Sequence, residues 1–585
     1  MALHLSCWLP LTCTLQKSNN NARINQQVKC AASRQISYHP TNHRRSANYQ
    51  PSVWSYNFLQ SLQIRYADDK YTKRAEKLEE EVRCKMIHNE DAEMLSILEL
   101  IDDIQRLGLG HRFEKDIKSA LDKIVSWEGF DVKAEDQKLH AIALRFRLLR
   151  QHGYQVSPDV FRPFMDDKGK FMEYIKTDVK GMLNLYEASY LAFEGENVLD
   201  EALTFSTTHL NGFKTNLGPD LSQLVSHALE LPLHRRMIRL EARWYIEAYS
   251  QRKYVNGLLL ELAKLDFNMV QSVLQNDLKD MSRWWKEIDL AKKLNFARDR
   301  LVECFIWAVG MVPNPQFNHC RQKLTKVASL ITTIDDIYDV YGTLNELELF
   351  TDAVQRWDLN AINDLPDYMK LCFMVLYNTI NEMAYDSLKE HGENVIPYLT
   401  KAWGDLCKAF LQEAKWSHNK HTPTFEDYFD NAWRSVSGTL FLVHSYFLVS
   451  QNITKEALES LDKQQHNLMR SSSIIFRLCN DLGTSTAELE RGETASSILC
   501  YIRQTGVSEE VAREHIRNII NETWKKMNKD VVDNEHPFGK TFVETAINLA
   551  RISHSTYQYG DGHGAPDVRA KRRVHSLIID PISLT

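Results

Sequence analysis

The chain has 585 residues, of which 43% are hydrophobic and 25% charged, a composition that supplies ample core material and excludes a wholly disordered protein. Its formal net charge is −6, so nothing suggests a nucleic acid as partner, and no apolar run reaches the roughly 18 residues of a membrane span. The ten cysteines are scattered and form no CxxC pair, which indicates free thiols in a reducing compartment.

The N-terminal stretch, residues 1–43, differs in composition from the rest of the chain. It contains no Asp or Glu, and it carries four basic residues among many Ser, Thr and Asn. Such a composition is typical of an organelle transit peptide. A secretory signal is the alternative, because residues 3–15 are fairly apolar, but no basic residue precedes them and Pro10 interrupts them. We therefore expect residues 1–43 to direct the protein to the plastid stroma.

From Tyr66 onward, apolar residues recur with the period of amphipathic helices, and almost no alternating strand pattern appears. One such stripe consists of Met94, Ile97, Ile101 and Ile104. The chain is also longer than one hydrophobic core usually serves. We therefore predict an all-α protein with two helical domains, residues 44–255 and 256–585.

The segment Asp335–Asp339 (DDIYD) places three carboxylates at the end of an apolar helical stripe. Asp335 and Asp339 are four residues apart and share one helix face, whereas Asp336 lies about 100° around it. Unpaired carboxylates there cost free energy unless a cation compensates them. Their hard oxygen atoms suit Mg²⁺, which keeps other positions for water and phosphate oxygens. An exposed acidic patch is the alternative interpretation.

A second group of oxygen donors follows in the segment Asn480–Glu488 (NDLGTSTAE). Asn480, Thr484 and Glu488 are spaced one per helical turn and offer an amide, a hydroxyl and a carboxylate oxygen, again hard donors. Arg477 precedes Asn480 by three residues and shares its face, which makes sense beside metal ligands if an anion bridges them. Ordinary helix surface is the alternative for this segment alone.

Two arginines, Arg298 and Arg300, precede the first acidic segment by about 35 residues. Residues i and i+2 do not face one way on a helix, so a pair directed at one anion requires a bend or loop. Forked guanidinium groups suit phosphate oxygens. A solvated charged turn is the alternative.

Together these motifs resemble those of plant class I terpene synthases of the monoterpene synthase type, in the angiosperm group that also contains isoprene and ocimene synthases. Asp335–Asp339 resembles the DDxxD motif of that family, Asn480–Glu488 its second metal motif, and Arg298–Arg300 its RxR motif. Arg44 and Arg45, followed by eight residues and Trp54, resemble its RRx₈W element. The resemblance covers nearly the whole chain from Arg44 onward.

The resemblance implies an N-terminal domain similar to a double α-barrel and a C-terminal class I terpene synthase fold that holds the active site. It also implies that Arg44, Arg45 and Trp54 belong to a segment that caps this site, although they could merely end the transit peptide. It further implies about three Mg²⁺ ions, with Mn²⁺ as an alternative. The implied metal ligands are Asp335, Asp339, Asn480, Thr484 and Glu488.

The implied reaction belongs to the carbon–oxygen lyases: a prenyl diphosphate ionises with metal and arginine assistance, and the carbocation loses a proton in an apolar pocket. The residues expected in catalysis are Asp335, Asp339, Arg298 and Tyr557. The residues expected to bind substrate are Arg298, Arg300, Asp335, Asp339, Arg477, Asn480, Trp307, Ala328 and Phe476. Either Tyr557 or the released diphosphate takes the final proton.

The length of the substrate is inferred from two pocket positions, Ala328 and Phe476. Ala328 precedes Asp335 by seven residues, where isoprene-forming relatives tend to carry a bulky Phe, and Phe476 is shared with them. A pocket with one Phe and one Ala should hold more than five carbons, which favours geranyl diphosphate over dimethylallyl diphosphate. We expect an acyclic product of the β-ocimene or myrcene type.

Three alternatives remain open at this point. Two are enzymes: a cyclic monoterpene synthase of the limonene or α-terpineol type, and an isoprene synthase. The third is a helical binding scaffold without catalysis. The sequence predicts neither a nucleic-acid partner nor a membrane span, and both a monomer and a homodimer are compatible with it.

Overall fold

The structure is a computed structural model that describes residues 44–84, 93–126, 138–213, 218–463, 466–490, 495–533 and 536–584, without the side chains of residues 463 and 486–490. The chain divides into two units, Met1–Arg44 and Arg45–Thr585. The predicted transit peptide, residues 1–43, lies outside the described residues. All helices named below belong to the second unit.

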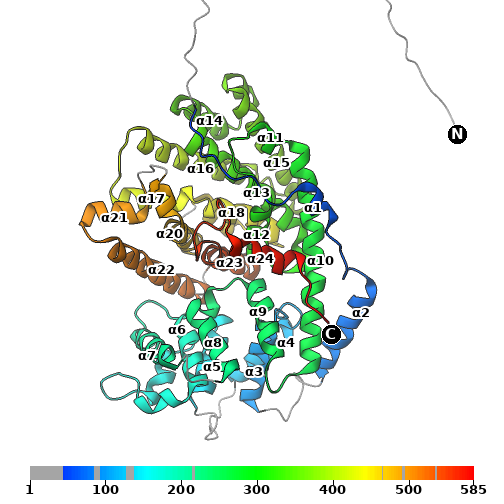
Figure 1. Cartoon of the computed structure of the whole chain (residues 1–585), viewed down its shortest axis with the longest axis vertical. Helices are drawn as coiled ribbons and strands as arrows, with labels where there is room; N and C mark the ends of the chain where they lie inside the picture. The colour runs from blue at the N-terminus through cyan, green and yellow to red at the C-terminus, as the bar shows by residue number, and fades with distance from the viewer. Residues whose placement is uncertain are drawn as a thin grey trace, which may run out of the picture. The chain divides into compact units, whose positions relative to one another are not determined.

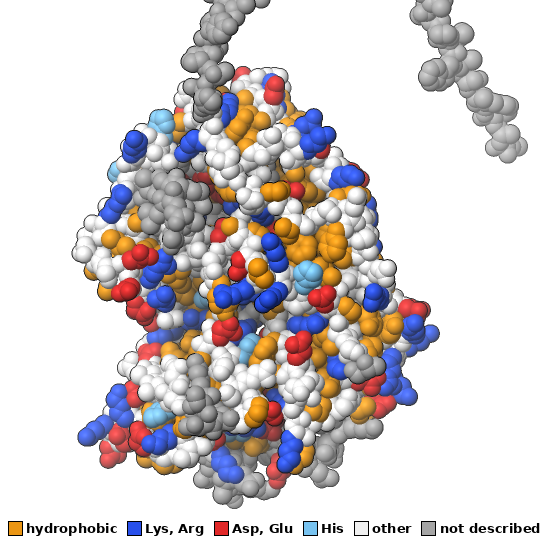
Figure 2. All heavy atoms as spheres, in the orientation of Figure 1, with side chains coloured by type: hydrophobic (Ala, Val, Ile, Leu, Met, Phe, Trp, Pro, Cys, Tyr) orange, Lys and Arg blue, Asp and Glu red, His pale blue; other side chains and the backbone are white. Residues whose placement is uncertain are grey.

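Helices build this unit, and the described residues contain no strand beyond one isolated β-bridge between Met165 and Phe171. The all-α prediction is therefore confirmed. In the described part of the chain, no helix is long and apolar enough to cross a membrane. On the face drawn in Figure 2, charged side chains of both signs are interspersed.

The first half of the unit forms the lower part of Figure 1 together with α1 and α2 at the right. Its helices are α1 (Tyr56–Ser61), α2 (Asp69–Val82), α3 (Met94–Arg106), α4 (Glu114–Ser126), α5 (Leu139–Gln151), α6 (Val179–Ser189), α7 (Asn197–Phe213), α8 (Pro219–Glu230) and α9 (Ile238–Ser250), with 3₁₀ turns η2 (Pro158–Phe164), η3 (Glu173–Thr177) and η4 (Leu233–Arg235). The apolar stripe predicted from Met94 onward lies on α3, where Ile101 and Ile104 are buried. Helices α5 to α8 enclose a core of their own around Phe146 and Leu199.

The second half forms the upper part of Figure 1. Its helices are α10 (Gly257–Ile288), α11 (Leu290–Lys293), α12 (Leu301–Met311), α13 (Asn318–Asp336), α14 (Leu344–Arg356), α15 (Asp367–His391), α16 (Ile396–His418), α17 (Phe425–Ser435), α18 (Gly438–Val449), α19 (Lys455–Lys463), α20 (Asn467–Glu490), α21 (Ser497–Thr505), α22 (Glu509–Val532), α23 (Lys540–Tyr557) and α24 (Val568–Val574), with 3₁₀ turns η5 (Pro315–Phe317) and η7 (Leu359–Asp364) and π turns η6 (Ile337–Tyr341) and η8 (His575–Ile579). The predicted boundary at residues 255/256 falls in the loop between α9 and α10, but the larger core extends across it, from Trp54 to Ile582. The position of the domain boundary therefore stays a prediction.

The helices that carry the two predicted metal motifs, α13 and α20, both pack on α18. Helix α18 is apolar on all sides and almost entirely buried, as befits a helix in the middle of a bundle. Helix α12 packs on α13 and α23, and α20 packs on α23. This arrangement brings the C-terminal ends of α13 and α23 to the middle of α20.

Two glycines allow the closest of these helix contacts. A Cβ atom on Gly310 of α12 would lie 2.6 Å from Ile552 Cγ1 of α23. A Cβ atom on Gly438 of α18 would lie 2.5 Å from Ser473 Oγ of α20. Larger residues would force these helices apart, because protein interiors are close-packed.

We expect Gly310→Ala to destabilise the protein by about 1–3 kcal/mol, the usual cost of overpacking a core. The matched control is Gly212→Ala on α7, where an added Cβ atom would meet no heavy atom within 4 Å; it should change stability by less than about 1 kcal/mol. Urea unfolding midpoints measure both. A Gly310→Ala variant as stable as the Gly212→Ala variant would contradict the tight contact between α12 and α23.

Candidate active site

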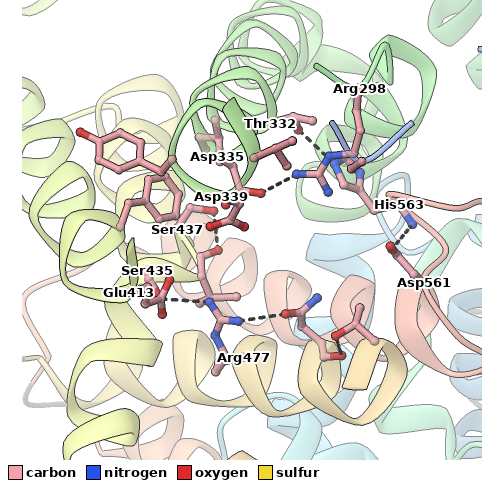
Figure 3. A pocket seen from close by; sticks show the side chains of 18 of the residues that line it. Arg298, Thr332, Asp335, Asp339, Glu413, Ser435, Ser437, Arg477, Asp561 and His563 are labelled. Carbon is pink, nitrogen blue, oxygen red and sulfur yellow. Dashed lines mark hydrogen bonds and ion pairs between the residues drawn. The ribbon is translucent and has the colours of Figure 1, made fainter. Parts of the chain in front are cut away.

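A cavity of about 460 Å³ opens between the C-terminal ends of α13 and α23 and the middle of α20, with α16, α17 and α18 completing its wall. This volume falls within the range of roughly 300–1,000 Å³ found for small-molecule sites. The predicted site residues in its lining are Arg45, Arg298, Trp307, Ala328, Asp335, Asp339, Phe476, Arg477, Asn480, Thr484 and Tyr557. Sequence positions more than 500 residues apart thus meet in one cavity, part of which is shown in Figure 3.

The first acidic motif lies where α13 ends and the π turn η6 begins. Asp335 and Asp339 line the cavity, although the backbone changes from α to π geometry between them. Single π turns are frequent at functional sites. Asp336, which the helical period places on a different face, is fully buried and is not part of the cavity lining. Burial raises the pKa of its carboxyl group.

Arg298 links Asp335 to Asp336. Its backbone N–H and its Nε donate to Asp336 Oδ2 at 2.7 and 3.1 Å, and its Nη2 donates to Asp335 Oδ2. Burial disfavours the charged guanidinium, but the two carboxylates outweigh burial and hold the pKa of Arg298 well above its usual value. Arg298 is therefore a permanent cation at the edge of the acidic wall.

The second motif lies on α20, across the cavity. The Thr484 hydroxyl donates to the backbone carbonyl of Asn480 at 2.9 Å, so its lone pairs remain for another partner. A Cβ atom on Gly483 would lie 2.9 Å from the Tyr557 carbonyl, so this glycine lets the end of α23 approach. Glu488 lies on the same helix, but its side chain is outside the described residues, and its role as a ligand stays a prediction.

Arg477 is held by acceptors from two helices. Its Nη1 donates to Asn480 Oδ1 at 3.0 Å, and its Nη2 donates to Ser435 Oγ at 3.0 Å. The Ser435 hydroxyl in turn donates to Glu413 Oε1 at 2.6 Å. Figure 3 shows this chain of side chains on the wall opposite Arg298. The guanidinium is therefore fixed beside the second motif before any ligand binds.

No signal in the sequence pointed to Glu413. It lies on α16, 67 residues before Asn480 in the chain, and no motif spacing includes it. Asp481 was also missed as a functional residue, although it lies inside the second motif. It is buried, and it accepts hydrogen bonds from the Tyr428 hydroxyl at 2.9 Å and the Ser497 backbone N–H at 2.9 Å. These contacts anchor α20 to its neighbours.

The other end of the cavity is aromatic. The ring centroids of Trp307 and Phe476 are 4.6 Å apart, and that of Tyr557 lies 6.1 Å from Trp307 and 6.3 Å from Phe476. Burial raises the pKa of the Tyr557 phenol, so this group is neutral near pH 7. Aromatic faces at such a place attract a cation. Ala328 lines the same cavity with a single methyl group.

His563 also lines the cavity, although it was not among the predicted site residues. Its Nε2 lies 3.0 Å from Thr332 Oγ1, and its ring packs against Trp307 at 6.5 Å between centroids. Burial lowers its pKa to about 3, so the imidazole is neutral at physiological pH. The sequence feature that could have indicated His563 is the Gly-rich stretch of residues 558–564, which follows Tyr557.

The cavity lining does not include Arg300, and of the three residues predicted to cap the site it includes only Arg45. Arg300 donates to backbone carbonyls and does not line the cavity. Trp54 packs in the core, where its Nε1 donates to Glu303 Oε1 at 3.2 Å. Arg45 does reach the site and donates to the Asp339 carbonyl at 3.0 Å, whereas Arg44 belongs to the preceding unit.

Glu413 makes stability depend on pH. Burial raises its pKa from the ordinary 4.5 to about 7, despite Arg477 nearby. Because the folded state then binds this proton more tightly than the unfolded chain, stability falls as pH rises from 4.5 to 7. Glu413→Gln keeps the acceptor for Ser435 and cannot ionise. We therefore expect its thermal midpoint, relative to wild type, to be higher at pH 8 than at pH 5.

The control for this measurement is Glu510→Gln, an exposed position on α22. Its midpoint relative to wild type should be the same at both pH values. If the thermal midpoint of Glu413→Gln differs from that of wild type by the same amount at pH 5 and pH 8, burial does not hold the Glu413 carboxyl group protonated.

Comparison with known proteins matches both halves of the chain to one family. The family description "Terpene synthase, N-terminal domain" matches residues 53–229, and "Terpene synthase family, metal binding domain" matches residues 286–526. The chain is 59% identical to a chloroplastic isoprene synthase of Populus alba, covering 93% of this chain and 91% of that one. It is 52% identical to a chloroplastic myrcene synthase of Quercus ilex, covering 96% and 94%.

A solved structure is equally similar. The crystal structure of isoprene synthase from grey poplar leaves (Populus x canescens), in complex with three Mg²⁺ ions and dimethylallyl-S-thiolodiphosphate, has a TM-score of 0.84 and 59% identity and covers 91% of this chain and 99% of that one. The predicted family and two-domain helical fold are thereby confirmed. The chain belongs to the terpene synthase family, lyases that act on prenyl diphosphates, and it carries the family's metal-binding domain.

Proposed function

We propose that this enzyme converts geranyl diphosphate to a volatile acyclic monoterpene of the β-ocimene or myrcene type. The observation that carries the proposal is the composition of the cavity. A charged end with Arg298, Asp335 and Arg477 adjoins an aromatic end with Trp307 and Phe476. This polarity complements an anion attached to an apolar tail.

The oxygen donors on the two walls fit a hard divalent cation. Asp335 and Asp339 provide carboxylates from one wall, and Asn480 and Thr484 provide amide and hydroxyl oxygens from the other. The Thr484 proton is already committed to the backbone, which leaves lone pairs for a cation. With Glu488, these residues would hold Mg²⁺, about three ions by analogy with the grey poplar complex, or Mn²⁺. When bound, the ions supply Lewis-acid stabilisation of the leaving diphosphate.

The chain's own side chains perform the remaining tasks. Arg298 and Arg477 stabilise the diphosphate from opposite walls as the carbon–oxygen bond breaks and its electron pair leaves with oxygen. The allylic cation that remains is stabilised by the faces of Trp307 and Phe476, at roughly 0.5–2 kcal/mol per ring. The reaction ends when a carbon next to the cationic centre loses a proton.

The final proton goes to the departed diphosphate in this proposal. Tyr557 was the other candidate, but burial keeps its phenol protonated, which makes it a weak acceptor. The diphosphate is anionic and stays in the same cavity until release.

The choice of geranyl diphosphate depends on Ala328. Relatives at 59% and 52% identity to this chain are an isoprene synthase and a myrcene synthase, so overall identity does not decide the product. Ala328 leaves space beside the aromatic wall that a larger side chain would fill. A cyclic product requires an additional ring-closing step. Among the described residues of the cavity, we find no contact that specifically favours this step.

We also propose that the enzyme works in the plastid stroma. The relatives from Populus alba and Quercus ilex carry the name chloroplastic. Residues 1–43 have the acid-free, hydroxyl-rich composition of a transit peptide.

Product analysis tests the proposed reaction. The full chain is incubated with Mg²⁺ and geranyl, dimethylallyl or farnesyl diphosphate in separate tubes, and volatiles are identified by gas chromatography and mass spectrometry. We expect an acyclic ten-carbon hydrocarbon from geranyl diphosphate. Asp335→Asn should lower turnover by about 10²- to 10³-fold, because the metal-ligand charge is lost, with an unchanged helical circular dichroism spectrum.

The other outcomes identify the alternatives. A ring in the product would establish a cyclic monoterpene synthase, and dominant isoprene would show that the argument from Ala328 is wrong. Wild-type turnover by Asp335→Asn would refute the assigned metal wall.

Substitution of Ala328 tests the inferred substrate length. We expect Ala328→Phe to lower kcat/KM for geranyl diphosphate by about tenfold or more, because the ring fills space needed by the second isoprene unit. Activity on dimethylallyl diphosphate should fall less, so the ratio shifts toward isoprene. Ala328→Ser, which keeps the small size, is the control. Equal losses on both substrates in Ala328→Phe would mean that this position does not select for length.

A further inference from the structure

Arg300 makes contacts that differ from those of Arg298, two residues earlier. It precedes the first turn of α12 with non-helical backbone angles, φ −132° and ψ 36°, so the two side chains diverge. Arg300 is only 4% exposed. Its Nε and Nη2 donate to the Gly564 carbonyl at 3.2 and 3.0 Å, and Nη2 also donates to the Gln50 carbonyl at 2.9 Å. One guanidinium thus holds backbone from both ends of the chain.

Arg300 therefore joins two segments that are distant in the sequence. The N-terminal segment comprises residues 45–55, which precede α1, and contains Gln50. The C-terminal loop comprises residues 558–567, between α23 and α24, and contains Gly564. Both lie on the face seen in Figure 1, the first in dark blue and the second next to the red helix α24.

Each segment also supplies residues to the cavity. Arg45 of the N-terminal segment donates to the Asp339 carbonyl, and Tyr49 lines the cavity beside Arg298. In the C-terminal loop, Asp561 Oδ1 accepts from the backbone N–H groups of His563 and Gly564 at 3.1 and 2.7 Å. This turn presents Asp561 and His563 to the cavity. Both segments are therefore covers of one site.

We propose that Arg300 is a positioning residue that joins the N-terminal segment to the C-terminal loop, so that the two segments order over the cavity together. When either carbonyl is in place, the guanidinium is already fixed for the other, which lowers the entropic cost of ordering the second segment. This role requires the planar guanidinium group, which can donate to both carbonyls at once. The ammonium group of a lysine is a poor substitute for it. A diphosphate contact is not part of this role.

A neighbouring contact supports the same arrangement. Glu303, one turn further along α12, accepts from Trp54 Nε1 at 3.2 Å, at the end of the N-terminal segment. Residues 300 and 303 thus fix the segment at two points, Gln50 and Trp54. The beginning of α12 serves as the attachment site for both covers.

Hydrogen exchange tests the coupling without any substrate. The variants are Arg300→Lys, a full chain lacking residues 45–51, and their combination. In Arg300→Lys, hydrogen exchange in peptides covering residues 45–55 and 558–567 should accelerate by about tenfold, which is the effect of losing one charge-assisted hydrogen bond. The deletion should accelerate exchange in residues 558–567 by a similar factor. In the combined variant, exchange in residues 558–567 should be no faster than in either single variant.

The matched control is Arg150→Lys on α5. Arg150 is likewise buried and forked, and it donates to the carbonyls of Val156 and Leu191 away from the cavity. This variant should leave exchange in both segments unchanged. The proposal is overturned if the deletion leaves residues 558–567 unaffected, or if the effects of Arg300→Lys and the deletion multiply.

A second readout rests on the proposed function. A loosened cover admits water, which captures the carbocation, so Arg300→Lys should raise the alcohol fraction of the products at least threefold. A raised KM with an unchanged alcohol fraction would instead assign Arg300 to diphosphate binding and overturn the proposal. Coupled exchange without product from any prenyl diphosphate would refute the proposed function and leave the positioning role standing.

Discussion

The ion pair of Arg298 with Asp335 and Asp336 is the interaction on which the polar end of the cavity depends. Asp336 is fully buried, and its carboxylate would be strongly destabilising without a cation beside it. By binding both carboxylates, Arg298 fixes the end of α13 at the point where the helix changes to a π turn. Asp335 and Asp339 are thereby held on the cavity wall.

On the opposite wall of the cavity, other residues likewise fix an arginine by hydrogen bonds to oxygen atoms. Arg477 supplies the cation, and Asn480, Ser435 and Glu413 supply the acceptors. Each wall thus combines a fixed arginine with oxygen atoms that can bind a metal ion. The space between the two walls suits an anion accompanied by divalent cations. Preorganised charges of this kind stabilise a leaving group without reorganisation during the reaction.

The sequence was sufficient for the features that local spacing determines. The helical period predicted the all-α fold, and spacing by four placed Asp335 with Asp339 and Asn480 with Thr484, because those positions share a helix face. The spacing also separated Asp336 from that face, but it did not predict that Asp336 is fully buried. The motifs also led to the family that the comparisons confirm.

Features that arise from tertiary contacts could not be predicted from the sequence. Glu413 on α16 is linked to Arg477 on α20 through Ser435 on α17, and no periodicity in the sequence marks such a contact. Arg300 looked like a partner of Arg298, but the backbone turns between them and sends its side chain toward Gln50 and Gly564. The domain boundary was hard to place because one core extends across it.

The most direct test of this account is a crystal structure of the full chain with Mg²⁺ and geranyl thiolodiphosphate, a substrate analogue that resists ionisation. The account predicts that Asp335 on one wall and Asn480 and Thr484 on the other would hold metal ions beside the diphosphate, with the prenyl chain next to Trp307 and Ala328. A diphosphate bound without metal ions, or bound away from these two walls, would contradict it.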